Sequence, residues 1–180
     1  MNPCEKNCSC EHCQKCGIPT RVIKGVESCE IGQLPTPAYG NFFQTNFITL
    51  DTNDPMPWNG MGETAGITLD PDTVTIRVTQ GGPYYIDYNV LGNQSPIIVP
   101  TTTDIILALF LNGTEVNPIQ TRYGTEDLEL DKAICVPISG GTIISIPPGG
   151  TIQLRNVGSK FATCDNGTIL SASINLIKLN

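Results

Sequence analysis

Six of the eight cysteines fall within the first 29 residues of the chain, where their spacing could support chemistry. Thiolates bind zinc, and they also form disulfides. The segment contains Cys4, Cys8, Cys10, Cys13, Cys16 and Cys29, with His12, the only histidine of the chain, among them. These residue types point either to a metal centre or to a set of covalent cross-links.

A zinc site in this segment would use four thiolates, or three thiolates with His12, in tetrahedral coordination. Cys13 and Cys16, with two residues between them, have the spacing of a zinc knuckle. Zinc modules, however, usually separate two such pairs by residues that pack around the metal. Thiols as close as these cannot easily pair with one another without strain. We therefore expect cross-links to other chains, and we keep zinc and unpaired thiols as alternatives.

The other two cysteines, Cys135 and Cys164, lie in an apolar run, AICVPI, and in a polar loop, FATCDNG. They could form a disulfide within the domain if the fold brings their Cα atoms within about 7 Å. The alternative is a buried small hydrophobic residue and a separate exposed thiol. Spacing alone does not decide between the two.

Alternating carboxylates form a second candidate site. Asp127, Glu129 and Asp131 share one face of an extended segment, and leucines occupy the other face. Such carboxylates could hold Ca²⁺, especially if three copies meet at an axis. A solvated strand face explains the same pattern, and we prefer it.

Several function classes are excluded by what the sequence lacks. The lone histidine lies in a polar segment without a core, and there is no phosphate-binding loop, so we expect neither an enzyme nor a cofactor. Residues 31–180 carry 13 acidic and 6 basic side chains, which would repel nucleic acid. We see no apolar run of transmembrane length and no signal peptide, so we expect no membrane partner.

Composition divides the chain into two parts. Residues 1–36 form a cysteine-rich arm that ends in the stiff segment LPTP, and residues 37–180 form a head. In the head, polar and apolar residues alternate in short segments that are separated by Gly, Pro, Asn and Asp. This alternation predicts about nine or ten strands in an all-β, antiparallel jelly-roll sandwich. Residues 73–90, with Gly81 and Gly82 at the centre, predict a β-hairpin.

The segment from Asp104 to Leu111 is apolar on both faces. In an antiparallel sandwich a strand normally has one wet face, so this strand needs a second cover. We expect a neighbouring subunit to supply it, and a long loop of the same chain is the alternative. The predicted interface residues are Ile105, Ile106, Leu107, Leu109, Phe110 and Leu111.

Five segments of the head carry a resemblance to a known family. They read PAYGNFF, TVTIRVTQGGPYYIDYNV, IILALFLNGTEV, IPPGGTIQLRNVG and SASINLIKL. This pattern resembles the globular heads of the tumour-necrosis-factor and complement-collagen superfamily. Within it, the likeness is to Bacillus spore-surface proteins, namely the head of the collagen-like exosporium glycoprotein and the basal-layer protein that anchors it. The resemblance implies a homotrimer of jelly rolls.

The chain departs from that family in its cysteines, and no Gly-X-Y collagen tract precedes the head. A spore surface is built in a mother cell without a signal peptide and becomes oxidised when that cell lyses, which favours disulfides. The resemblance thus implies a structural subunit of the endospore surface, in the exosporium or an appendage, that is linked to itself and to other spore-surface proteins through the arm. A lectin-like or receptor-binding head is the alternative.

Overall fold

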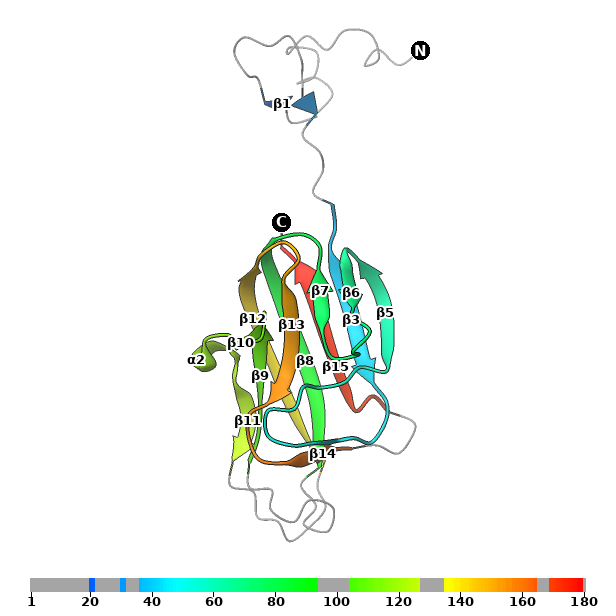
Figure 1. The fold of residues 1–180 in the computed structure, drawn as a ribbon, viewed down its shortest axis with the longest axis vertical. Coiled ribbons are helices and arrows are strands. Elements are labelled where there is room, and N and C mark those ends of the chain that lie inside the picture. The colour runs from blue at the N-terminus through cyan, green and yellow to red at the C-terminus, as the bar shows by residue number, and fades with distance from the viewer. Residues whose placement is uncertain are drawn as a thin grey trace. The chain divides into compact units, whose positions relative to one another are not determined.

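The computed structural model describes residues 20–21, 30–31, 36–93, 104–126, 135–164 and 169–179 (Figure 1). The chain divides into two units, Met1–Thr36 and Pro37–Asn180. In the first unit, β1 (Thr20–Arg21) pairs with β2 (Glu30–Ile31) in antiparallel orientation. All other described strands belong to the second unit, the head.

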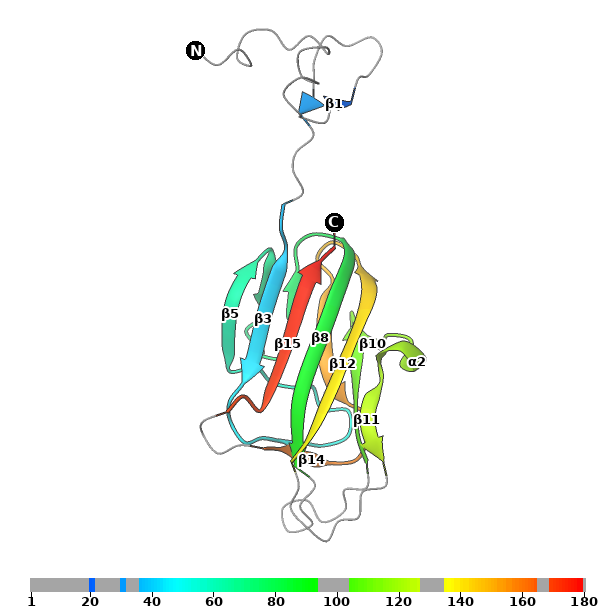
Figure 2. The same cartoon turned by 180° about the vertical axis from the view of Figure 1, so that it is seen from behind.

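One sheet of the head is built around the long strand β8, and we call it the β8 sheet. Figure 2 shows β5, β3, β15, β8 and β12 side by side across it. In this sheet β12 pairs with β8 over the whole length of both strands, and β14 pairs with the end of β8 at Gly92 and Asn93. The strands, in spatial order, are β4 (Thr49–Leu50), β14 (Phe161–Thr163), β8 (Gly82–Asn93), β15 (Ala172–Lys178), β3 (Tyr39–Gln44) and β5 (Gly60–Ala65), with β12 (Cys135–Ile146) on β8.

The second sheet, which we call the β9 sheet, packs against the first (Figure 1). Its strands in spatial order are β10 (Thr114–Glu115), β9 (Asp104–Leu111), β13 (Thr151–Asn156), β7 (Ile76–Val78) and β6 (Ile67–Leu69), with β11 (Tyr123–Glu126) also on β9. A four-residue helix, α2 (Pro118–Thr121), follows β10, and the Asn117 side chain caps it by accepting from the Ile119 N–H. All strand pairs are antiparallel, so the predicted jelly-roll sandwich is confirmed.

The core lies between the two sheets, because alternate residues of each strand point inward. In β8 the inward side chains are Tyr84, Ile86, Tyr88 and Val90, each at most 2% exposed. The phenol of Tyr88 reaches the main-chain oxygen of Thr121 at 3.2 Å, which satisfies its hydroxyl inside the core. Burial raises the pKa of that phenol above its ordinary value.

The hairpin predicted over residues 73–90 is wrong. Its two halves, β7 and β8, belong to different sheets, and the chain crosses from one sheet to the other near Gly81. A Cβ at Gly81 would lie 2.6 Å from Cδ of Pro148, so this corner packs tightly against the turn before β13. Within β7 and β8 the alternation correctly separates inward from outward residues, whereas before β7 it is Thr75 and not Val74 that is buried. It carries no information on whether the second strand folds back beside the first or crosses to the facing sheet.

Candidate self-association surface

Four large apolar side chains form a continuous row on the outer face of the β8 sheet, and we call this row the apolar band. Its members, in order across the sheet, are Tyr39, Ile177, Tyr85 and Ile143. Each comes from a different strand, and direct cross-strand pairing brings them together. Three spacings of about 4.8 Å make the row roughly 14 Å long. The exposed fractions are 39% for Tyr39, 48% for Ile177, 39% for Tyr85 and 54% for Ile143. Such contiguous apolar surface is typical of an interaction site.

A polar row runs parallel to the apolar band, two residues farther along each strand. Asn41 Nδ2 donates to Asn175 Oδ1 at 2.7 Å, and Asn175 Nδ2 donates to Asp87 Oδ2 at 3.0 Å. These bonds fix the orientations of both amide groups, and they give the Asp87 carboxylate a hydrogen-bond donor in Asn175. The next row continues the pattern, because Asn89 Nδ2 donates to Ser139 Oγ at 2.8 Å. The outer face therefore combines an apolar band with ordered polar groups that can set the register of a partner.

Two shallow hollows flank Asp87 on this face. One, of about 450 Å³, lies between Tyr39, Glu63 and Ile177, and the other, of about 340 Å³, lies between Tyr85, Tyr123 and Ser139. The apolar band forms part of the wall of each hollow. The face is thus uneven and could receive side chains of a partner.

The β12 strand is held rigidly behind this face by aromatic packing. Tyr88 and Tyr123 meet edge to face with their ring centroids 6.1 Å apart. A Cβ at Gly140 would lie 2.4 Å from the Tyr123 ring, so the two rings can reach the strand only because this position has no side chain. The Tyr123 hydroxyl also donates to the main-chain oxygen of Gly141 at 3.0 Å.

The predicted interface on β9 lies on the other sheet and is largely covered. Within this chain Phe110 is covered by the guanidinium of Arg155, which lies 4.6 Å from the ring centroid. Outward-facing Ala108 is fully buried in the chain itself. The predicted residues divide into three that lie in the core, Ile105, Leu107 and Leu109, and three that are half-buried, Ile106, Phe110 and Leu111. The three core residues pack between the sheets and are covered by this chain itself, whereas contact of the three half-buried residues with a subunit stays a prediction.

The cysteines of the head are joined. Cys135 and Cys164 form a disulfide with their Cα atoms 6.0 Å apart. Both flank the end of β8: Cys135 is the register partner of Asn93, and the N–H of Cys164 donates to the Leu91 oxygen at 2.7 Å. The other predicted site residues lie outside the described residues, namely Cys4, Cys8, Cys10, His12, Cys13, Cys16, Cys29, Asp127, Glu129 and Asp131.

Several charged groups of the described head form ion pairs with one another. Arg77 binds Asp70 at 2.6 Å, and Arg122 binds Glu115 at 2.6 Å. The hydrogen bond from Arg122 lowers the pKa of Glu115. Within the described ranges, no three His, Cys, Asp or Glu side chains gather as a metal site would require, and no helix there is long and apolar enough to cross a membrane.

Sequence reasoning missed the apolar band, although its signal was present. Tyr85, Ile143 and Ile177 each occupy the outward phase of an alternating strand, where a polar residue is the usual choice. A large apolar residue at such a position in several strands indicates a contact surface. Only the strand pairing, however, shows that these residues are neighbours.

Comparison with known proteins establishes the fold of the head. No family model and no curated protein matches the chain. Among solved structures, the head is similar to Eiger TNF from S. frugiperda, with a TM-score of 0.61, 12% identity, and coverage of 81% of this chain and 94% of the other. The head is also similar to the globular domain of zebrafish complement 1qA, with a TM-score of 0.56, 10% identity, and coverage of 79% of this chain and 98% of the other. For murine APRIL the TM-score is 0.56 at 11% identity, and the alignment covers 79% of this chain and 99% of the other.

Proposed function

We propose that this chain is a structural, non-enzymatic subunit of the bacterial endospore surface whose heads associate as homotrimers through the outer face of the β8 sheet. The observation that carries the association is the apolar band, four large side chains that stand between 39% and 54% exposed in one continuous row. Burying the exposed part of such a side chain contributes about 1 kcal/mol. The resemblance to Bacillus exosporium proteins supports both the trimer and the location.

The polar row beside the apolar band supports the same face. An interface that buries a polar group must supply hydrogen bonds for it. Asn41, Asn175 and Asp87 already bind one another, so a second copy that covers this row must supply partners only for the remaining acceptor positions of Asn41 and Asp87. Exosporium layer and appendage are both compatible with this proposal, and so is covalent linkage to other spore-surface proteins through the arm.

Light scattering tests the association. A full-length variant with the six arm cysteines changed to Ser removes covalent links and isolates the contribution of the head. We use this variant as the parent for the next substitution, and we expect it to have three times the mass of one chain at micromolar concentration. Adding Ile177→Asp, which places a charge in the apolar band, is expected to yield the monomer because an unpaired charge is costly to bury.

Ile119→Asp is the matched control, since Ile119 is 97% exposed on α2 and lies outside the apolar band. This control should keep the trimeric mass. A monomeric parent would contradict the proposal. A trimer that tolerates Ile177→Asp as well as it tolerates Ile119→Asp would place the interface on another surface.

A further inference from the structure

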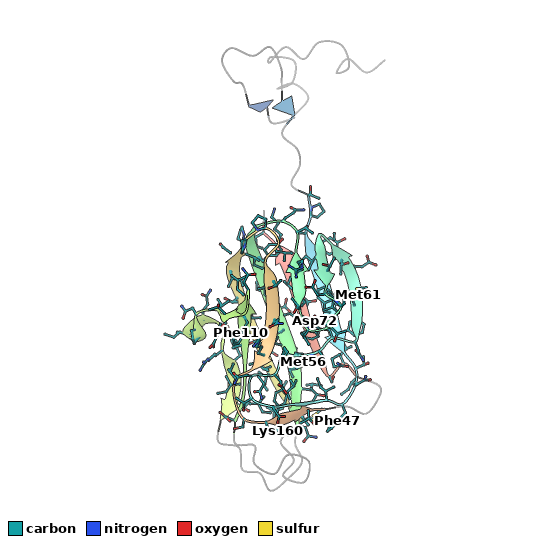
Figure 3. The ribbon with its side chains drawn as sticks, in the orientation of Figure 1. Phe47, Met56, Met61, Asp72, Phe110 and Lys160 are labelled. Atoms are coloured by element: carbon teal, nitrogen blue, oxygen red, sulfur yellow. A yellow bond between two sulfur atoms is a disulfide. The ribbon has the colours of Figure 1, made fainter. Side chains whose placement is uncertain are left out.

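A groove opens between the edge strands of the two sheets, away from the apolar band. The strand β5 ends the β8 sheet, and β6 ends the β9 sheet. Only Gly66, in a left-handed conformation with φ of 63°, separates β5 from β6 in the chain. The groove holds about 470 Å³, and Met61, labelled beside β5 at the edge of the sandwich in Figure 3, stands 63% exposed on its rim.

Buried apolar side chains line the groove at its base. Trp58 and Ile67 are each 1% exposed, and Ile67 would meet a Cβ at Gly40, on β3 of the facing sheet, at 3.3 Å. The main chain of Trp58 is fixed, because its N–H donates to the Thr73 oxygen at 2.8 Å. The base is therefore packed from both sheets.

The indole N–H of Trp58 has no hydrogen-bond partner among the described residues. A buried donor without a partner costs about 1–3 kcal/mol, so such groups in native structures call for an explanation. Trp58 lines the groove, and the groove is open to a ligand. The nitrogen is closed to solvent, so an acceptor in the groove would reach this donor only after the lining side chains shift.

Thr73 supplies a second anomaly at the same place. It lines the groove with φ of 62°, a conformation that is strained for a β-branched residue. Strain of this kind concentrates at ligand sites. The Asp72 carboxylate supports the strained turn by accepting from the N–H groups of Val74 and Thr75 at 3.0 and 2.9 Å.

The remaining rim is uncharged and hydroxylated. Thr64, Thr68 and Thr73 contribute hydroxyl groups, and Met61 and Leu69 contribute apolar surface. None of the described residues that line the groove is charged. A threonine hydroxyl both donates and accepts hydrogen bonds, as sugar hydroxyls do. An anionic or cationic ligand would find no counter-charge here.

We propose that this groove binds an uncharged sugar residue, with its C–H face on Leu69 and Met61 and its hydroxyls on the threonine rim. Once the lining side chains shift, a ring or hydroxyl oxygen would accept from the Trp58 indole. The volume is within the range of small-molecule sites. The groove and the apolar band share no residue, so this proposal does not rest on self-association.

Trp58 is the only tryptophan of the chain, so its fluorescence reports on this groove alone. The full-length protein would be titrated with the methyl glycosides of glucose, galactose and N-acetylglucosamine, together with glucuronic acid and the neutral peptide acetyl-trialanine amide. Saturation-transfer NMR would be recorded in parallel. We expect at least one neutral glycoside to change the Trp58 emission and to receive saturation, whereas the acid and the peptide do neither.

The double variant Thr64→Val and Thr68→Val removes two rim hydroxyls with little change in shape. We expect it to weaken binding of that glycoside at least tenfold, since each lost hydrogen bond is worth about 1 kcal/mol. Thr114→Val, on β10 outside the groove, is the matched control and should bind normally. Failure of all three glycosides, binding of the peptide in their place, or full binding by the double variant would overturn the proposal.

Discussion

Asp72 shows how one side chain can hold the turn that precedes β7. Its carboxylate accepts from the hydroxyl of Thr75 at 2.6 Å as well as from two main-chain N–H groups. Figure 3 labels it over the middle of the sandwich in this view. The hydroxyl bond is the largest cause that lowers the pKa of Asp72 below its ordinary value of 3.8. A lowered pKa in the folded state means that the ionised carboxylate stabilises the fold.

We expect Asp72→Ala to lower the free energy of unfolding by about 1 kcal/mol at neutral pH, because the side chain is exposed and its bonds are partly screened. The folded pKa lies below 3.8, so this contribution is complete above that pH and disappears as the pH falls through the folded value. Urea denaturation of both proteins at neutral pH and at about pH 2.5 measures the difference. An equal difference at the two pH values would contradict the carboxylate's role.

Phe110 shows what alternation cannot reveal at the scale of a residue. The sequence places it on the outward face of β9, and from that face we inferred a subunit contact. In the structure Arg155, from the neighbouring strand, covers its ring. The pairing of β9 with β13 puts Arg155 opposite Ala108. Gln153, the register partner of Phe110, lies two residues before Arg155 on the same strand, so both side chains are on the same face as Phe110. Cover by a residue so distant in sequence depends on strand order, which local periodicity does not encode.

At the scale of elements, strands were predictable and their partners were not. The bounds of β9 agree with the segment predicted from Asp104 to Leu111. The failed hairpin at residues 73–90 has correct inward residues within β7 and β8, because burial demands the period of two in either arrangement. Whether β8 pairs with β7 or crosses to the other sheet depends on β12 and β15, which come later in the chain and supply the long-range pairing.

Two adjacent glycines of β12 provide a test of element packing. A Cβ at Gly140 would lie 2.4 Å from the Tyr123 ring and 2.7 Å from the Tyr88 ring, whereas a Cβ at Gly141 would first meet the Tyr85 hydroxyl at 3.1 Å. We expect Gly140→Ala to cost about 1–3 kcal/mol through overpacking. Gly141→Ala, on the opposite face, should be nearly neutral, because the added methyl meets only a side-chain tip and the unfolded chain loses entropy.

Chemical denaturation of the parent and the two alanine variants measures this difference. The two glycines are neighbours on one strand, so both substitutions change the β-strand propensity and the entropy of the unfolded chain by the same amount. Equal destabilisation by both substitutions would show that strand flexibility, and not contact with Tyr88 and Tyr123, requires glycine here. Destabilisation by Gly140→Ala alone would establish the aromatic packing behind the outer face.

At the scale of the whole molecule, the sandwich was predictable but the surface it displays was not. The apolar band joins positions 39, 85, 143 and 177, which become neighbours only when four strands pair in one order. Each position alone reads as an ordinary exposed apolar residue. The groove beside Trp58 likewise exists only because β5 and β6 end different sheets. Both surfaces are products of topology.

The cysteines fall into two groups that should act on different properties of the molecule. Cys135 and Cys164 close a loop with a sequence separation of 29, which restricts the unfolded chain. By the chain-entropy estimate, a loop of this size stabilises the head by about 3–4 kcal/mol. The proposed bonds of the arm join separate chains, so they should affect dissociation of an assembly and leave the stability of each head unchanged.

Substitution by serine separates the two groups. Replacing Cys4, Cys8, Cys10, Cys13, Cys16 and Cys29 should abolish species that survive boiling in detergent without reductant, and it should leave the melting temperature of the head unchanged. Cys135→Ser with Cys164→Ser, the matched control, should lower that temperature because the head loses its loop constraint, while the detergent-resistant species persist. A chelator should change neither property. If a chelator dissolves the assembly of the parent and metal analysis finds stoichiometric zinc, the arm is a metal site and the covalent role is wrong.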